Sequence, residues 1–289
     1  MSTVTFHDYM DFANNLRSEY GHSPDNLFGG SKKVKYANIP FAFDIETTST
    51  YQGEKCNENK RAFMYIWQFG YQSPNEVFCF TYGRDWYSFV SLVHEIADIL
   101  KLDNEHRICI YVHNLAFEFA FLQKLFDWDN VFFRDFRKPI YALVHGVEFR
   151  CSMMLSGGKS LKTVGDELLR PVAKRVGDLD YLKIRSENTP LKKEEMGYCI
   201  ADIEIVLEYI REKIENEGHI SALPLTNTGY VRRHMRDCCF RKQETLYRGN
   251  KETDPVSGFV PCCKRGIQWW RDTCESIPCE CGTTRCRFI

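Results

Sequence analysis

The sequence predicts a mixed α/β fold in which a central sheet is flanked by helices. Three features of its hydrophobic pattern lead to this prediction. Residues 36–83 hold three strand-like segments in a row, residues 85–112 hold a helical stripe followed by a short apolar strand, and residues 190–218 form a long amphipathic helix. Amphipathic helices that alternate with strands bury their apolar faces against the sheet.

The first three strands read as a β-meander. Residues 36–48, 61–71 and 75–83 are rich in β-branched and aromatic residues, and polar or turn-forming residues separate them. Residues 1–35 are expected to be a polar lead-in, loosely ordered at the turn-forming GGSKK near its end.

The later elements follow from the period of the apolar residues and from helix start and stop signals. The long helix begins after Pro190 and ends at Gly218. In chain order the pattern predicts a helix from about Asp85 to Leu102, a strand at 107–112, a helix opening at 113–126, strands or hairpins within 133–155, a helix at 160–169 and the long helix at 190–218.

Composition excludes a uniformly basic nucleic-acid binder. The 289 residues include 38 Lys and Arg against 39 Asp and Glu, and 44% hydrophobic content is ample for a core. Two local clusters of cations remain candidates for binding a phosphate backbone, and the alternative for each is a solvated helix face. The clusters are Lys159, Lys162, Arg170, Lys174 and Arg175, and then Arg232, Arg233, Arg236, Arg241 and Lys242.

Targeting signals are not evident in the sequence. The N-terminal residues are polar and aromatic, and no apolar run approaches the roughly 18 residues that a membrane span needs. The sequence therefore predicts a soluble, cytoplasmic protein without a membrane partner. Of the 13 cysteines, the five before residue 238 occur singly and read as small buried side chains, while the others crowd into the tail.

The stretch FAFDIETTST, residues 41–50, places two carboxylates on a strand that otherwise reads as buried. Phe41, Phe43 and Ile45 share one face, so Asp44 and Glu46 share the other. Like charges this close repel one another unless they are solvated, share a proton or bind a cation. The strand therefore either faces water or belongs to a metal site.

Two later segments supply polar groups with matching spacing. Asn114 and Glu118 are four residues apart at the start of a predicted helix, just beyond a strand end, and Tyr198 and Asp202 have the same spacing on the long helix. Each segment alone is also typical of an amphipathic helix with polar residues beside its apolar face.

Together the segments resemble the three exonuclease motifs of family B DNA polymerases. An acidic pair in D-I-E-T, then H-N-L-x-F-acid-x-x-F, then Y-x-x-x-D occur at residues 44–47, 113–121 and 198–202. The likeness is closest to the protein-primed branch found in bacteriophages.

Two further segments support the resemblance, which extends over residues 38–240. Residues 160–164, SLKTV, are similar to the Ser/Thr-Leu-x-x-hydrophobic motif with which that family binds single-stranded DNA. Residues 225–237 resemble a stretch that precedes the polymerase palm in phage enzymes of this type.

The resemblance implies an RNase H-like (DnaQ-like) exonuclease fold and a domain plan. Residues 1–35 would be the lead-in, 36–218 the 3′–5′ exonuclease domain, 219–248 a linker resembling the start of the polymerase region, and 249–289 an atypical Cys-rich tail. The implied activity is proofreading hydrolysis of the 3′-terminal nucleotide of single-stranded or frayed DNA during phage DNA replication in the bacterial cytoplasm.

The resemblance also implies roles for individual residues. Asp44, Glu46, Glu118 and Asp202 would hold two divalent cations, Mg²⁺ or Mn²⁺, and Tyr198 would orient the attacking water. The positions that would contact the primer terminus are Thr47, Asn114, Phe117, Ser160 and Leu161. Phe117 is an aromatic on which a terminal base can stack, and its alternative is a core phenylalanine.

Two positions depart from the family pattern. The second motif usually carries Asp where this chain has Glu118, which keeps the ligand type but adds a methylene. The protein-primed branch also carries a catalytic Lys just before a G-D-x-D-Y segment. The matching segment here is preceded by Val176, with Lys174 and Arg175 nearby, so the Lys role is either relocated or missing.

The polymerase motifs of the family do not occur in this sequence, so nucleotide incorporation is not expected from this chain alone. In addition to the DNA 3′ end, the resemblance suggests a terminal protein or a separate polymerase part as partners. Two alternatives remain open: a free-standing processing exonuclease with the same four carboxylates, and an inactive remnant that binds single-stranded DNA.

The tail has two interpretations. Six cysteines could form a zinc module, although their spacing lacks two clean C-x-x-C pairs and no His accompanies them. Alternatively, one permitted codon choice for residues 264–276, read in a shifted frame, gives RGAFNGGETHAN. That product resembles the A-F-x-G-G-x-T-H-A-N segment between exonuclease and polymerase in phage enzymes, so we favour an out-of-frame extension.

Overall fold

The computed structural model describes residues 3–22, 27–30, 33–51, 53, 59–73, 75–173 and 183–249, with side chains to residue 238. The chain divides into two compact units, residues 1–228 and 229–289. The first unit contains the sheet, and most of α7 belongs to the second. None of the helices in the described part is both long and apolar enough to cross a membrane.

The regular elements account for most of the described residues. In chain order they are β1 (Thr3–Phe6), α1 (Tyr9–Tyr20), β2 (Phe28–Gly30), β3 (Lys35–Tyr51), β4 (Lys60–Gln72), β5 (Phe78–Gly83), α2 (Trp86–Leu100), β6 (His106–Val112), α3 (Leu115–Leu122), β7 (Asn130–Asp135), β8 (Lys138–Val144), β9 (Val147–Cys151), α4 (Ser152–Leu155), α5 (Leu161–Glu167), α6 (Lys193–Glu217), the 3₁₀ helix η3 (Ile220–Ala222) and α7 (Asn227–Gly249).

The strands form one mixed sheet in the order β1-β5-β4-β3-β6-β9-β8-β7, and β2 pairs with β3. β3, β4 and β5 are the antiparallel meander that the sequence predicts, while β3, β6 and β9 run parallel. Parallel neighbours need crossover connections, and here α2 and α3 lie in those connections. The pairing of β3 with β6 ends at Ala42 and Tyr111, so Asp44 in the middle of β3 lies just beyond it, near the carboxyl end of β6 and the start of α3.

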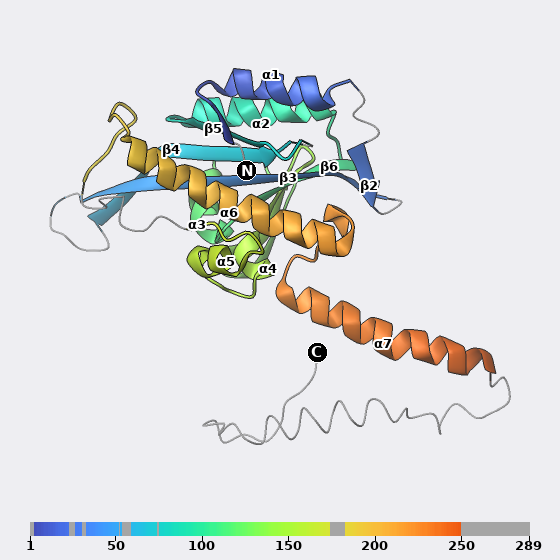
Figure 1. Ribbon diagram of the computed structural model, residues 1–289. Helices are drawn as coiled ribbons and strands as arrows, with labels where there is room; N and C mark the ends of the chain where they lie inside the picture. Colours follow the sequence, from blue (N-terminus) through green and yellow to red (C-terminus); the bar gives the residue numbers. More distant parts are fainter. Residues whose placement is uncertain are drawn as a thin grey trace, which may run out of the picture. The chain divides into compact units, whose positions relative to one another are not determined.

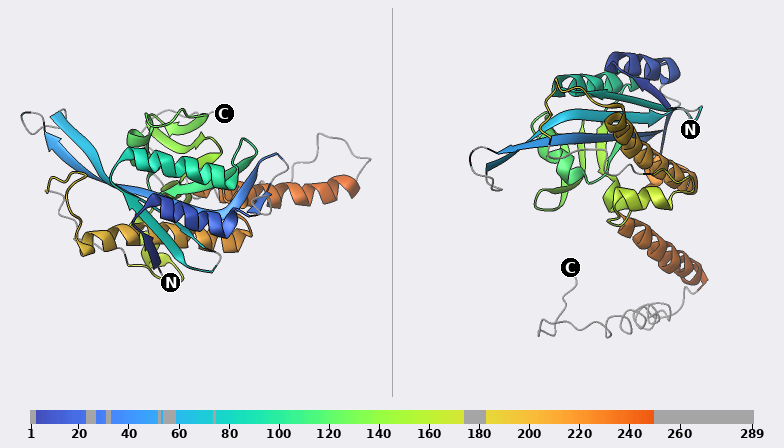
Figure 2. Two further views of the ribbon diagram at one scale, coloured as in Figure 1. Left: turned by 90° about the horizontal axis from the view of Figure 1, so that it is seen from above. Right: turned by 60° about the vertical axis from the view of Figure 1, so that its left-hand side comes forward.

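Helices cover both faces of the sheet. Figure 1 and Figure 2 show α1 and α2 on one face and α6 on the other. On the first face Phe43 of β3 stacks on Phe89 of α2, with ring centroids 4.3 Å apart. On the second face a side chain at Gly70 would lie 2.9 Å from Ile203 of α6, so the glycine lets that helix approach the sheet closely.

The first thirty residues contribute to the core, which the sequence analysis did not anticipate. β1 pairs in parallel with β5, and Phe12, Leu16 and Tyr20 of α1 are buried in the main apolar cluster. The spacing of these three residues is that of one helical stripe, and the Asp8 side chain caps the helix by accepting a hydrogen bond from the backbone of Met10.

A hydrogen bond from Asn15 helps α1 to dock on the sheet. Its side-chain amide donates to the Tyr71 hydroxyl at 2.7 Å. We expect Asn15→Ala to lower the free energy of unfolding by about 0.5–1.5 kcal/mol, because the partly buried hydrogen bonds to the Tyr71 hydroxyl and, more weakly, to the Cys79 sulfur are lost while Tyr71 still donates to Glu19. The measurement is urea denaturation beside Asn14→Ala, an exposed neighbour whose loss should change stability by less than about 0.5 kcal/mol. Equal effects of the two substitutions would contradict the docking role.

Candidate metal centre and nucleic-acid site

β3 turns two carboxylates away from the core under α1 and α2. Phe41, Phe43 and Ile45 belong to that core, so the alternation of the strand directs Asp44 and Glu46 to the face that carries α6. The pairing with β4 is irregular directly after Glu46. Such a bulge interrupts the alternation and is common beside functional sites.

α6 brings a third carboxylate to the same place. Asp202 is only 3% exposed, and its neighbours Ile203 and Val206 are buried where the helix docks. One carboxylate oxygen from each of Asp44, Glu46 and Asp202 lies within 4.8 Å of the other two. The structure thus brings together three of the four carboxylates that the sequence analysis selects, from one strand and one helix.

Glu118 of α3 lies next to this cluster but outside the group of three. It is 3% exposed, and its Oε2 atom makes no hydrogen bond within the described residues. Burial, and then the negative charge of Asp44, raise the pKa of Glu118 well above its usual value. A buried carboxyl group beside another acid retains its proton more readily, and a nearby cation reverses that preference.

The donor set fits a hard divalent cation. Two of the three converging carboxylates, Glu46 and Asp202, are buried and Asp44 is partly buried, so their charges repel one another and a cation between them offsets the repulsion. All the donors are oxygen atoms, which Mg²⁺ and Mn²⁺ prefer, whereas zinc sites in proteins draw mostly on His and Cys. The group Asp44, Glu46 and Asp202 is therefore able to bind a metal ion.

Two further side chains near the carboxylates were not selected from the sequence. The Cys199 thiol is buried, and burial followed by the charges of Glu46, Asp44 and Asp202 raises its pKa. Gln68 is fully buried opposite Asp44 on β4, and neither its amide nitrogen nor its oxygen makes a hydrogen bond within the described residues. Opposed residues of a hairpin point to the same face, but the register that pairs Gln68 with Asp44 is known only from the packed sheet.

Tyr198 lies on α6, one helical turn before Asp202. Its side chain is 6% exposed, so the hydroxyl-bearing ring is largely enclosed by protein. A residue four positions earlier on a helix projects from the same face about 6 Å away along the axis. Tyr198 and Asp202 therefore share the α6 face that carries the acidic cluster.

Three residues that the sequence analysis selects as contacts of a primer terminus lie at the start of α3 and after the bulge in β3. Asn114 precedes the helix in the left-handed conformation, with φ 71° and ψ 53°, and its side chain does not cap the helix. Phe117 is 43% exposed, which excludes the core phenylalanine interpretation. Thr47 follows the bulge in β3 and is partly exposed.

The segment around α5 is linked to the end of β6 through His113. One ring nitrogen of His113 lies 3.1 Å from the Ser152 hydroxyl, and the other lies 3.1 Å from the Lys159 carbonyl oxygen. Ser160 is the N-cap of α5, and Leu161 is 8% exposed. His113 thereby links the α3 motif to the segment that holds Ser160, a role that its place in the motif could have suggested.

The basic clusters have different surroundings. In the first, Lys159 pairs with Glu167 and Lys162 with Asp166, as expected for a solvated helix face. In the second, Arg232 is exposed on α7. Several predicted features lie outside the described residues: Lys174, Arg175 and Val176, the side chains of Arg241 and Lys242, and the Cys-rich tail from residue 250.

Comparison with known proteins gives a structural likeness without a family match. No protein-family model matches the chain, and no curated protein matches it. Phi29 DNA polymerase, complexed with primer-template DNA and incoming nucleotide substrates, matches 80% of this chain and 38% of that chain, with a TM-score of 0.53 and 15% identity. An orthorhombic crystal form of Phi29 DNA polymerase matches 71% and 35%, with a TM-score of 0.54 and 16% identity.

A third structure, the EXO domain of Aedes aegypti Nibbler, matches 75% of this chain and 89% of that chain at 11% identity, with a TM-score of 0.35. The chain thus spans less than two fifths of the length of the polymerases that it matches. At these identities the likeness shows the fold, and the predicted RNase H-like fold with a central mixed sheet flanked by helices is confirmed.

Proposed function

We propose that this chain is the 3′–5′ exonuclease region of a family B DNA polymerase of the protein-primed type. The observation that carries the proposal is the cluster of Asp44, Glu46 and Asp202, with Glu118 beside it. The cluster belongs to a fold similar to part of a DNA polymerase solved with primer-template DNA. The substrate is the 3′ end of single-stranded or frayed DNA, and the setting is proofreading during phage DNA replication.

The reaction is hydrolysis of the last phosphodiester. Water adds to the phosphorus, the bond to the 3′ oxygen breaks, a nucleoside monophosphate leaves, and the shortened strand retains a 3′ hydroxyl. Asp44, Glu46, Glu118 and Asp202 are the residues that would hold two Mg²⁺ or Mn²⁺ ions. The chemistry that such ions supply is a lower pKa for the attacking water and stabilisation of the leaving oxygen.

Other residues position the reactants. Tyr198, from the face of α6 that carries Asp202, orients the water by accepting or donating a hydrogen bond through its hydroxyl group. Asn114 and Thr47 flank the cluster at the start of α3 and after the bulge in β3, where they contact the terminal nucleotide. Ser160 and Leu161 contact the strand from the start of α5.

The direct test is digestion of a 5′-labelled single-stranded oligonucleotide with Mg²⁺ or Mn²⁺. A ladder that shortens from the 3′ end, and that disappears when the 3′ end is blocked, supports the proposal. Absence of digestion by folded protein with either metal would favour the alternative of a remnant that only binds single strands. A separate assay with deoxynucleotides should give no extension by this chain alone, because a terminal protein and a polymerase part are proposed to come from elsewhere.

Phe117 offers a test of substrate binding that leaves the carboxylates untouched. We expect Phe117→Ala to weaken binding of a single-stranded oligonucleotide by about 5- to 100-fold, because stacking on an aromatic ring is worth about 1–3 kcal/mol per base. Stability should change little, since the ring is 43% exposed. The measurement is fluorescence anisotropy in EDTA beside Phe117→Tyr, which retains a stacking ring. Equal weakening by both variants would contradict a stacking role.

A further inference from the structure

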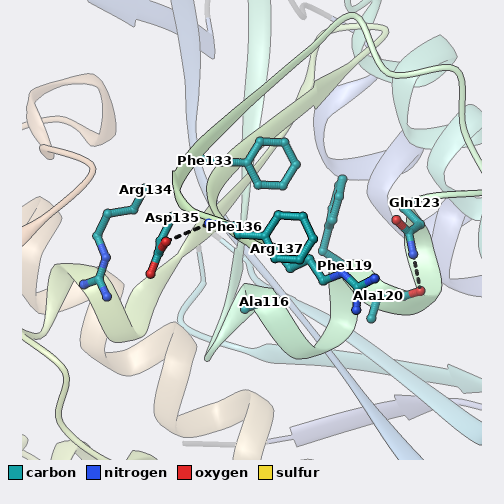
Figure 3. A pocket seen from close by; sticks show the side chains of 9 residues that line it. All are labelled: Ala116, Phe119, Ala120, Gln123, Phe133, Arg134, Asp135, Phe136 and Arg137. Carbon is teal, nitrogen blue, oxygen red and sulfur yellow. Dashed lines mark hydrogen bonds between the residues drawn. The ribbon is translucent and has the colours of Figure 1, made fainter.

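A cavity of about 760 Å³ lies between α3 and the β7–β8 hairpin. Figure 3 shows the rings of Phe133 and Phe136 on the hairpin side, and Ala116 and Ala120 on the side of α3. Successive helix residues are about 100° apart, so Glu118, which lies between these two alanines, projects from the other side of α3. The cavity is therefore separate from the carboxylates, yet only about one helix diameter, 10–12 Å, from them.

The hairpin exposes three neighbouring phenylalanine rings. Phe132, Phe133 and Phe136 are 51%, 45% and 80% exposed. Phe132 and Phe133 belong to β7, an edge strand of the described sheet, and Phe136 lies in the turn that follows it. A single exposed aromatic is ordinary, but three within five residues of one hairpin indicate a binding surface.

Cations accompany these rings. The Arg137 guanidinium lies 5.0 Å from the centre of the Phe136 ring, and within the described residues neither Arg134 nor Arg137 forms an ion pair with a carboxylate. Asp135 also lines the cavity, but its carboxylate accepts a hydrogen bond from the Phe136 backbone and pairs with Lys138. The two arginines therefore leave the wall of the cavity with a net positive charge.

The backbone at Arg137 adds a second observation. Arg137 adopts φ 57°, a left-handed conformation that glycine accepts at lower cost in a hairpin. An arginine here keeps a guanidinium beside the Phe136 ring at the tip of the hairpin. Alternating rings and guanidinium groups of this kind bind the bases and phosphates of single strands, because every base offers a face for stacking.

We propose that this cavity is a second binding site for single-stranded DNA, which takes bases on the 5′ side of the terminus held at the carboxylates. Phe133 and Phe136 stack with these bases, and Arg134 and Arg137 contact the phosphates. The identity of the strand rests on the proposed exonuclease function. With this site the protein contacts a longer stretch of single strand, while the reacting bond is not contacted. The contribution of the site to affinity therefore depends on oligonucleotide length.

The test compares two lengths of single-stranded oligonucleotide: a trinucleotide and one of about 12 nucleotides, within the range of about 4–16 that one binding fold covers. Binding is measured by anisotropy in EDTA, and hydrolysis separately with Mg²⁺ or Mn²⁺. We expect Phe136→Ala/Arg137→Gln to weaken binding of the longer strand by about 5- to 100-fold and to leave the trinucleotide unchanged. A blunt duplex, whose bases are stacked on one another, should not compete.

The matched control is Tyr87→Ala/Lys101→Gln on α2. Tyr87 is 79% exposed near the start of the helix, and Lys101 is its C-cap with a positive φ, 52°, so the control removes one exposed ring and one cation away from the cavity. If the hairpin variant binds both oligonucleotides with the same affinity as wild type, the cavity proposal is overturned, whatever the hydrolysis assay shows. Length-dependent binding that needs the hairpin, without any hydrolysis, would support the cavity and overturn the exonuclease.

Discussion

Asp44→Asn should reduce 3′–5′ hydrolysis by more than about 100-fold while the protein remains folded. Loss of a residue that merely supports a metal ligand commonly costs about 10- to 100-fold, so loss of a ligand itself should cost more. Asparagine has nearly the same shape as aspartate but removes one of three negative charges whose oxygen atoms lie within 4.8 Å of one another. The measurement is the rate of shortening of a 5′-labelled oligonucleotide with saturating Mn²⁺.

The control for this substitution is Asp98→Asn, which makes the same chemical change on the exposed side of α2. Asp202→Asn should match Asp44→Asn, and the double variant should be little worse than either, because residues that act as one unit are not additive. Urea denaturation without metal should show Asp44→Asn to be at least as stable as wild type, since repulsion in the cluster decreases. Activity within about threefold of wild type would place the reaction elsewhere.

The strands near the site could be predicted from sequence because their signals are local. The alternation of Phe41, Phe43 and Ile45 is enough to give β3 its buried face and to place Asp44 on the other face. The sequence does not predict α1 because half of its residues are polar, and its helical signals are limited to a narrow apolar stripe and the capping residue Asp8. Its burial depends on β1 pairing with β5, a contact between distant segments that no local pattern encodes.

Only the joint occurrence of the three motifs in the sequence predicts that the carboxylates lie close together. Spacing on a helix places Tyr198 and Asp202 on one face, but it does not say that this face meets β3. Nor does sequence give the burial of Glu118 beside Asp44, which raises its pKa, or the position of Gln68 opposite Asp44. These features depend on the sheet register and on crossovers, which fix distances only once the whole domain has packed.

Glu118→Gln should weaken binding of a cation without reducing the stability of the metal-free protein. Glu118 is buried, and burial together with Asp44 raises its pKa, so the protein without metal already favours a neutral side chain at this position. Glutamine is neutral and has the same length, so we expect stability without metal to be unchanged or higher. A cation needs the ionised carboxylate, so hydrolysis should decrease by more than about 100-fold, as for loss of another ligand.

The measurement for Glu118→Gln is denaturation with and without Mn²⁺, since a ligand present at 100 times its dissociation constant stabilises the native state by about 2.7 kcal/mol. Mn²⁺ should give wild type this added stability, and Glu118→Gln should lose most of the gain. Glu118→Asp, which keeps a carboxylate on a shorter side chain, should retain part of it. If Glu118→Gln is strongly destabilised without metal, its carboxylate contributes to folding in the ionised form. If Mn²⁺ stabilises the variant as much as wild type, Glu118 is not a ligand, and only Asp44, Glu46 and Asp202 bind the ion.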